Sequence, residues 1–84
     1  MTIFYHPRFR RSYDNLSESI KKKAEKRELV FRKNLFDSRL DTHKLHGKLQ
    51  NFWSFSVDFR FRILFEFDGP DIIFLDIGDH NLYK

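Results

Sequence analysis

The sequence predicts an α+β domain in which a small antiparallel sheet packs on an N-terminal helical hairpin. Three observations predict it. Apolar and polar residues alternate from Trp53 to Phe67, which is typical of strands with one buried face. Asp68 and Gly69 form a strong hairpin signal after that stretch. Residues 18–33 repeat apolar positions at helical spacing. The predicted order is strand, helix, helix, strand, strand, strand (β-α-α-β-β-β), and the sheet-and-hairpin arrangement follows from it.

The first strand and the first helix are short. Residues 2–6 read as an opening strand, which Pro7 ends because it lacks a backbone donor and favours the first turn of a helix. Phe9 and Tyr13 lie four residues apart and so share one helical face. We therefore expect a short amphipathic helix directly after Pro7.

The second helix has a clear start. Ser17 is a suitable N-cap, and Glu18 in the first turn suits the helix dipole. The helical pattern continues to about Lys33. Residues 34–51 show no sustained period and contain a glycine, so they are predicted to be a connecting loop.

The alternating stretch predicts two antiparallel strands with one solvated face. The side expected to face the core holds Trp53, Phe55, Val57, Phe59, Phe61, Ile63, Phe65 and Phe67. The other side holds Ser54, Ser56, Arg60, Arg62 and Glu66. Two arginines two positions apart on one rigid strand can form an anion site.

A third consecutive strand follows the Asp-Gly turn. Residues 72–77 are apolar on both faces, which is typical of a strand inside a sheet. Gly78 ends this strand, and the remaining residues form a short tail.

Composition narrows the possible classes of protein. The 84 residues form a single domain, residues 1–84, and contain no cysteine, which excludes disulfides and thiolate metal sites. No closely spaced set of His and carboxylates resembles a structural zinc site, so we expect neither metal nor cofactor. Residues 1–50 hold 13 Lys and Arg against 6 Asp and Glu, whereas residues 51–84 hold 3 against 6. This basic front half suits a partner that carries phosphate or acidic side chains, although the lysines near residue 22 are also compatible with a solvated helix surface.

The sequence shows no targeting or membrane signal. Its N-terminus has no apolar segment behind a basic start, and no apolar run reaches the roughly 18 residues of a membrane span. We therefore expect a soluble, cytoplasmic protein with no membrane partner.

Three segments carry a resemblance to a known family. The segments THKLHGKLQNFWSFSV, FRFRILFEF and FLDIGDHNLY, in this order of elements, resemble the RelE/ParE superfamily of bacterial type II toxins, nearer to its RelE, YafQ and StbE branches. The resemblance covers essentially the whole chain. It implies a toxin that binds an antitoxin and, in the RelE and YafQ branches, acts as an mRNA interferase, a metal-independent endoribonuclease that cleaves messenger RNA on the ribosome and so blocks translation.

The resemblance also implies a set of catalytic residues. Arg62 stands where the RelE branch has a functional arginine, and His80 stands where the YafQ branch has a catalytic histidine. Tyr83 matches the terminal aromatic of both branches, and His43 matches a functional histidine of the YafQ branch. Residues expected to bind RNA beside them are Arg60, Ser54, Ser56, Lys44 and Lys48.

These residue types suit the chemistry. Attack by the 2′-hydroxyl of RNA requires a base, a cation for the phosphate charge and an acid for the leaving oxygen. Histidine serves either proton role near neutral pH, and arginine can bond two phosphate oxygens at once. Outside the family context, Arg62 could instead pair with Glu66, and His80 could be an idle surface residue.

The sequence departs from the family at three positions and leaves two other functions open. Ser54 and Ser56 replace the lysines of RelE and the aspartate and histidine of YafQ, and Asp76 stands at the position of a YafQ arginine, where it would repel phosphate if it faced the site. One alternative is a ParE-like inhibitor of DNA gyrase, and the other is a non-catalytic module that only binds an antitoxin. In each toxin class we expect a hetero-oligomer with an antitoxin whose amphipathic segment carries an apolar stripe flanked by Asp and Glu.

Overall fold

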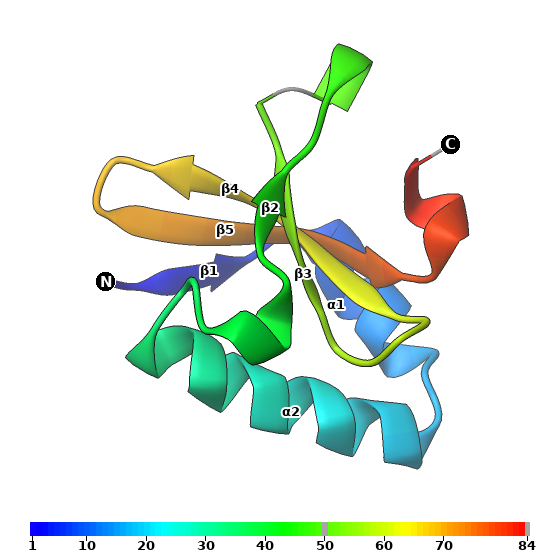
Figure 1. The fold of residues 1–84 in the computed structure, drawn as a ribbon. Coiled ribbons are helices and arrows are strands. Elements are labelled where there is room, and N and C mark those ends of the chain that lie inside the picture. The colour runs from blue at the N-terminus through cyan, green and yellow to red at the C-terminus, as the bar shows by residue number, and fades with distance from the viewer. Residues whose placement is uncertain (50, 84) are drawn as a thin grey trace.

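The computed structural model describes residues 1–49 and 51–83, the last of these without its side chain. A five-stranded sheet carries both helices on one face (Figure 1). The helices and strands are β1 (Ile3–Tyr5), α1 (Pro7–Asp14), α2 (Glu18–Lys33), β2 (His43–Lys44), β3 (Trp53–Ser56), β4 (Arg62–Asp68) and β5 (Asp71–Gly78). Three single-turn helices, η1 (Ser38–Leu40), η2 (Gly47–Leu49) and η3 (His80–Tyr83), complete the described elements. The α+β class and the predicted order of the main elements are confirmed.

The sheet is mixed, in the order β1-β5-β4-β3-β2. The β3–β4 and β4–β5 pairs are antiparallel, as predicted, and the β2–β3 pair, which was not predicted, is antiparallel too. The first strand differs from the predicted antiparallel sheet, because β1 runs parallel to β5, with Ile3 opposite Ile72. A parallel pair needs a crossover connection, and the two helices belong to that connection. The segment 34–51, predicted to be a loop, also contributes the two-residue edge strand β2.

Local capping explains where the helices start. The His6 side chain accepts a hydrogen bond from the Arg8 backbone at 3.0 Å, and Pro7 occupies the first position of α1. Ser17 Oγ accepts from the Ile20 backbone at 3.3 Å, so its predicted role as the N-cap of α2 is confirmed.

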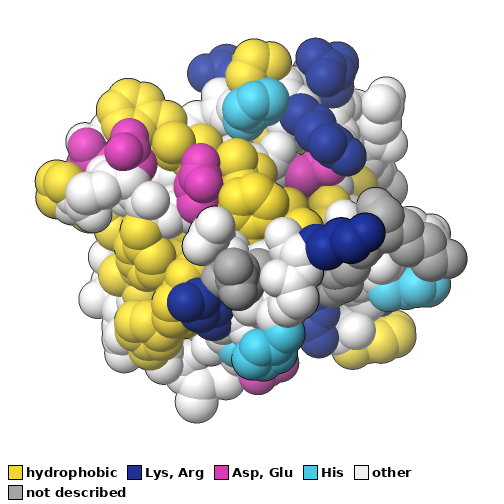
Figure 2. Space-filling model, turned by 90° about the horizontal axis from the view of Figure 1, so that it is seen from above, with side chains coloured by type: hydrophobic (Ala, Val, Ile, Leu, Met, Phe, Trp, Pro, Cys, Tyr) yellow, Lys and Arg dark blue, Asp and Glu magenta, His cyan; other side chains and the backbone are white. Residues whose placement is uncertain are grey.

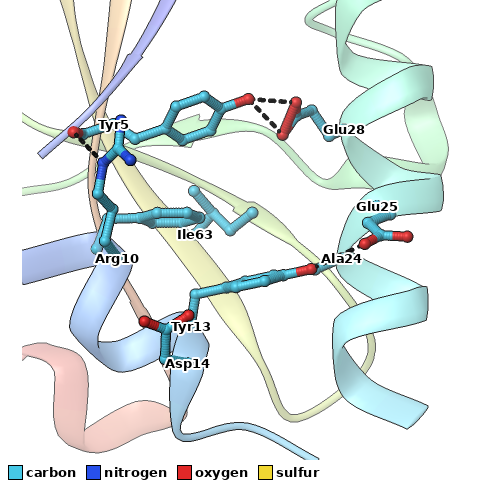
Figure 3. A pocket seen from close by; sticks show the side chains of 9 residues that line it. Tyr5, Arg10, Tyr13, Asp14, Ala24, Glu25, Glu28 and Ile63 are labelled. Atoms are coloured by element: carbon cyan, nitrogen blue, oxygen red, sulfur yellow. Dashed lines mark hydrogen bonds between the residues drawn. The ribbon is translucent and has the colours of Figure 1, made fainter. Parts of the chain in front are cut away.

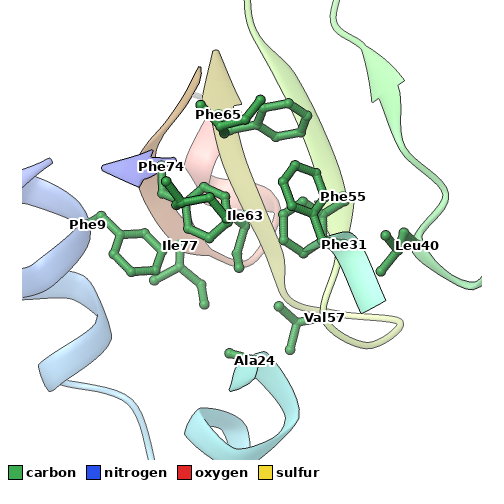
Figure 4. Packing of buried hydrophobic residues seen from close by; sticks show 12 residues of the cluster. Phe9, Ala24, Phe31, Leu40, Phe55, Val57, Ile63, Phe65, Phe74 and Ile77 are labelled. Atoms are coloured by element: carbon green, nitrogen blue, oxygen red, sulfur yellow. The ribbon is translucent and has the colours of Figure 1, made fainter. Parts of the chain in front are cut away.

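The core lies between the helices and the sheet, and five phenylalanines form a cluster within it, surrounded by aliphatic side chains (Figure 4). Phe31 of α2 stacks on Phe55 of β3 with ring centroids 4.5 Å apart and meets Phe65 and Phe74 edge-on. Phe9 of α1 joins the same cluster through Phe74. Both helices therefore attach to one shared aromatic cluster.

Two aromatic residues lie outside this core, which corrects the sequence prediction. Phe59 is 95% exposed because β3 ends at Ser56 and β4 begins at Arg62, so the alternating pattern is interrupted by a turn. Phe67 is 43% exposed near the β4–β5 hairpin. Among the described helices, none is long and apolar enough to cross a membrane.

Candidate active site

The candidate site lies on the face of the sheet away from the helices, here called the open face. Residues directly opposite each other on paired strands point to the same side of a sheet. Ser56 lies opposite Arg62, and Arg62 lies opposite Gly78, so these three form one row across β3, β4 and β5. The chain leaves the sheet after Gly78 and continues into η3, which begins with His80. The row therefore brings Arg62 next to the start of the C-terminal tail.

Arg62 is held in place from two sides. Its Nη1 donates a hydrogen bond to Ser56 Oγ at 2.7 Å and lies 3.7 Å from Asp41 Oδ2. The Arg62 side chain is 26% exposed. A guanidinium that is both fixed and accessible can bind a phosphate with little loss of side-chain entropy.

Asp41 also connects Arg62 to His43. The Nδ1 atom of His43 lies 2.8 Å from the Asp41 carbonyl oxygen, and Asp41 has a left-handed backbone with φ of 50°. Because a carbonyl only accepts, a neutral His43 ring carries its proton on Nδ1 and leaves the Nε2 lone pair free. The exposed imidazole is thus arranged to accept a proton at Nε2.

The tail is ordered by Asp79. Its Oδ1 accepts from the Asn81 backbone at 3.0 Å, and its Oδ2 lies 3.9 Å from Arg60 Nη2. The Asn81 N–H, with smaller contributions from the charges of His80 and Arg60, holds the pKa of Asp79 below its usual range. His80 is exposed at the start of η3. Tyr83 belongs to the same turn, but its side chain lies outside the described residues.

A second row on the open face is largely closed off. His43, Ser54, Leu64 and Asp76 lie opposite one another on successive strands. Ser54 is fully buried, and within the described residues its hydroxyl has no hydrogen-bond partner. RNA therefore cannot reach Ser54 in this arrangement, whereas Ser56 takes part in the site through Arg62.

Asp76 is neutralised by a residue that the sequence analysis missed. Its Oδ2 lies 2.9 Å from Arg8 Nε, and its side chain is 9% exposed against 67% for Arg8. The Asp76 carboxylate also accepts from the Ile77 backbone at 2.8 Å. Arg8 thus offsets the repulsion expected from Asp76 and adds a cation from α1 to this face. No sequence signal connects the two residues, because they meet only when α1 packs on β5.

The two lysines and Arg60 are spread around the site. Lys44 lies opposite Trp53, whose ring packs on the core residue Phe65, so Lys44 points away from the side that His43 faces. Lys48 is exposed on η2. Arg60 stacks over the Phe61 ring at 5.5 Å from its centroid, beside the tail. The structure brings Arg60 close to the tail and leaves Lys44 on the opposite side of the edge strand.

A hollow of about 240 Å³ with both apolar and charged lining adjoins the site on the open face. Seen from above, apolar side chains occupy the middle and left of this face, Asp and Glu side chains lie directly beside them, and Lys and Arg side chains lie mainly at the top and right (Figure 2). The hollow is lined by Arg8, Leu49, Phe52, Leu64, Leu75, Asp76 and Leu82. These side chains shield the floor of the open face from water and leave the Arg8–Asp76 pair at its edge.

A larger hollow, of about 430 Å³, lies between the two helices and the sheet (Figure 3). Its wall pairs two tyrosines with two carboxylates: the Tyr5 hydroxyl donates to Glu28 at 2.6 Å, and the Tyr13 hydroxyl donates to Glu25 at 3.0 Å. Burial, together with the hydrogen bond to Glu25, raises the pKa of Tyr13 to about 12. This mainly acidic lining repels anions, so the open face is the better candidate for binding a phosphate.

In the described part of the chain, no three His, Asp or Glu side chains gather closely enough to hold a metal ion. The open face presents the fixed Arg62 guanidinium with the Ser56 hydroxyl, the exposed His43 imidazole and the paired charges of Arg8 and Asp76, and exposed His80 lies on the tail that follows Gly78. Asp41 was the other residue that sequence reasoning missed. Asp41 lies two residues before His43, which could have suggested a contact between these two residues. Its contact with Arg62 depends on how η1 packs and could not be read from the sequence.

Comparison with solved structures defines the class of fold. The sequence matches no protein-family model, and no curated protein matches it either. The structure is similar to the YoeB/ParE toxin from Agrobacterium tumefaciens, with a TM-score of 0.80 at 13% identity, covering 95% of this chain and 99% of the other. The chain therefore has the fold of the RelE/ParE-like toxins.

Two further solved structures have a similar fold. YafQ from E. coli strain BL21(DE3) matches with a TM-score of 0.80 at 13% identity over 96% of this chain and 94% of the other. YoeB in the YoeB–YefM toxin–antitoxin complex from Staphylococcus aureus matches with a TM-score of 0.75 at 17% identity over 95% and 97%. Similarity at these identities concerns the fold.

Proposed function

We propose that this chain is the toxin of a type II toxin–antitoxin system and acts as an endoribonuclease on messenger RNA at the ribosome. The observation that carries the proposal is the row on the open face, where Ser56 holds Arg62 beside the segment that leads to His80. The similarity of the fold to YoeB and YafQ supports the same class. The target implies action in the cytoplasm, where ribosomes translate.

The proposed reaction needs only the RNA and these side chains. The 2′-oxygen attacks the adjacent phosphorus, the bond from phosphorus to the 5′-oxygen breaks, and a cyclic phosphate and a 5′-hydroxyl result. Arg62 stabilises the charge that builds on the phosphate oxygens. His43, with its lone pair on Nε2, accepts the 2′-hydroxyl proton, and His80 on the tail donates a proton to the leaving oxygen. Tyr83 is proposed to stack on a base beside the scissile bond.

The test is ribosomal cleavage by matched variants. Arg62→Ala should lower the rate of mRNA cleavage by about 100- to 1,000-fold, because it removes a preorganised transition-state donor. His80→Gln should lower the rate by about 100-fold or more while ribosome binding persists. Cleavage is measured by primer extension on purified translating ribosomes, and far-UV circular dichroism checks that each variant folds. An Arg62→Ala protein that cleaves at the wild-type rate would refute the assignment.

A ParE-like gyrase inhibitor is the second candidate. The observation that favours it is the weak cationic character of the second row, where Ser54 is buried and Asp76 is already paired with Arg8. Expression of the chain without a partner separates the candidates. Arrested replication with intact messenger RNA would indicate gyrase inhibition, and normal growth at full expression would indicate a module that only binds an antitoxin.

The proposed partner is an antitoxin. The matched YoeB structure contains the antitoxin YefM. The basic front half of this chain suits an amphipathic segment rich in Asp and Glu, which would form a hetero-oligomer with the toxin.

A further inference from the structure

Phe59 is the most exposed large apolar side chain among the described residues, at 95%. It lies in the turn between β3 and β4, and its sequence neighbours are the charged residues Asp58 and Arg60. Folding gains nothing from an apolar ring left in water. The ring is therefore fully available to a binding partner.

The turn that carries Phe59 is rigid. The Asp58 carboxylate accepts hydrogen bonds from the backbone of Arg60 at 2.9 Å and of Phe61 at 2.7 Å. The same carboxylate lies 3.4 Å from Lys23 Nζ of α2, and the Val57 backbone donates to the Phe61 carbonyl at 2.9 Å. A ring presented from a turn with this many fixed bonds can bind a ligand without an ordering cost in the backbone.

The turn also lies beside the candidate active site. Phe59 precedes Arg62 by three residues, so the chain spans at most about 10 Å between their Cα atoms. Arg60 reaches across to Asp79 at 3.9 Å, and Asp79 directly precedes His80. The exposed ring, a cation and the tail with its histidine therefore form one continuous region.

The surroundings of Phe59 suit a nucleobase better than a protein. Protein partners bury contiguous apolar patches. The other exposed large apolar side chains in the described chain lie elsewhere, at the N-terminus, on β1, on α2, after α2 and at the far end of β4. Around Phe59 stand Arg60 and Lys23, whose side chains are 64% and 53% exposed and can meet phosphates. Each cation also has a carboxylate beside it, Asp79 for Arg60 and Asp58 for Lys23. An exposed aromatic ring next to an accessible arginine is nevertheless an arrangement with which proteins bind single-stranded nucleic acid.

We propose that Phe59 is a stacking platform for a base of single-stranded RNA, with Arg60 binding the adjoining phosphate, and that it positions the strand for cleavage beside Arg62. This role rests on the proposed RNA-cleaving function. It makes the β3–β4 turn part of the RNA-binding surface, outside the residues that transfer protons.

The test measures RNA binding separately from cleavage. In a His80→Gln background, a fluorescent single-stranded RNA of about eight nucleotides is titrated with protein, and anisotropy is read between about 50 and 200 mM salt. Phe59→Ala and Phe59→Leu should each weaken binding by about 5- to 150-fold at every salt concentration, because neither side chain has a π face. Phe59→Trp should keep the affinity.

Two controls make the result specific. Phe36→Ala removes a ring that is 58% exposed on the loop after α2, and it should leave binding unchanged. Arg60→Ala should instead flatten the dependence of log affinity on log salt by about 0.7, which the Phe59 variants should not do.

Several results would overturn the proposal. RNA binding by Phe59→Ala equal to that of Phe36→Ala, full binding by Phe59→Leu, or no RNA binding by the His80→Gln parent would each refute base stacking. Loss of antitoxin binding in Phe59→Ala, with RNA binding intact, would assign the ring to a protein partner. The proposed function is tested independently. If the wild-type chain cleaves RNA but binding does not depend on Phe59, only the stacking role is refuted. If binding depends on Phe59 but the wild-type chain does not cleave RNA, only the nuclease function is refuted.

Discussion

The two serines on β3 differ in environment although both alternate to the same side of the sheet. Ser56 accepts the hydrogen bond that orients Arg62, at 2.7 Å. Ser54, two residues earlier, is fully buried, and its hydroxyl has no partner in the part of the chain that the structure describes. A buried hydroxyl without a partner costs free energy, whereas a hydrogen bond to a charged group contributes it. Ser56 therefore positions a functional side chain, whereas Ser54 is polar without a visible role in the site.

We predict opposite effects for the two alanine variants. Ser56→Ala should lower the cleavage rate by about 10-fold, because Arg62 loses about 1.5 kcal/mol of orienting interaction, and should lower the free energy of unfolding by about 1 kcal/mol. Ser54→Ala should cleave normally and raise the free energy of unfolding by about 1 kcal/mol. The measurements are primer extension and urea denaturation. A loss of activity in Ser54→Ala, with normal activity in Ser56→Ala, would show that the open face is arranged differently.

The elements are held by local bonds at their ends and by shared aromatic rings in the middle. The turn between β3 and β4 depends on Asp58. Burial raises the pKa of this carboxyl, but the backbone N–H groups of Phe61 and Arg60, together with Lys23, outweigh burial and hold the pKa below its usual range. A carboxyl whose pKa is lowered by folding stabilises the folded state above its unfolded pKa and loses that contribution as pH falls through the folded pKa.

Asp58→Asn should therefore destabilise the domain in a pH-dependent way. At pH 7 we expect a loss of about 1 to 2 kcal/mol in the free energy of unfolding, since hydrogen bonds to a charged acceptor are replaced by weaker ones. The difference from wild type should shrink as pH falls below about 4, the ordinary range for Asp. Urea titrations at several pH values measure this. Asp68→Asn, in the exposed β4–β5 turn, is the control and should show little change at any pH.

Phe31 is the main contact of α2 with the sheet, and its side chain is fully buried against Phe55, Phe65 and Phe74. Phe31→Ala should lower the free energy of unfolding by about 3 to 5 kcal/mol, a large share of the stability of a small domain. Phe36→Ala removes the same side chain from an exposed position and should cost less than about 1 kcal/mol. Thermal denaturation compares the two, and equal losses would contradict the assignment of Phe31 to the core.

For the whole molecule, the sequence predicted the layers better than the details of the site. The helix from Ser17, the hairpin at Asp68 and the interior strand β5 follow from capping, turn chemistry and periodicity, which act over a few residues. The parallel pairing of β1 with β5 and the short strand β2 depend on contacts between distant segments, which periodicity does not encode. The burial of Phe59 was predicted wrongly, because the alternation of apolar and polar residues continues through the turn between β3 and β4.

The candidate site shows the same division. The resemblance and the alternating pattern together pointed to Arg62 and His80, because both residues belong to recognisable local segments. The partners that fix the site, Asp41 and Arg8, come from other elements and meet β4 and β5 only in the folded chain. Ser54 looked available on a polar face, yet neighbouring segments cover it completely.

The distribution of charge over the molecule predicts how a partner binds. With a net charge of +4 concentrated in residues 1–50, association with an acidic segment should be electrostatically steered. The association rate with the protein encoded by the neighbouring reading frame should fall as salt rises, and hydrogen exchange should show protection of the tail from Asp79 onward. A rate independent of salt, or a footprint confined to residues 68–71, would contradict the binding of an acidic antitoxin segment across the tail.

The parallel pairing of β1 with β5 has a consequence for synthesis of the protein. Ile3 to Tyr5 find their strand partners only at Ile72 to Phe74, so the first strand must wait until nearly all of these 84 residues have left the ribosome. Pairing over such a sequence distance also slows folding, because the chain loses the entropy of closing a long loop before the stabilising contacts form. The row containing Arg62 and Gly78 is completed by the same late strand. A nascent chain that has not yet exposed β5 therefore contains neither the β1–β5 pair nor the complete row of Ser56, Arg62 and Gly78.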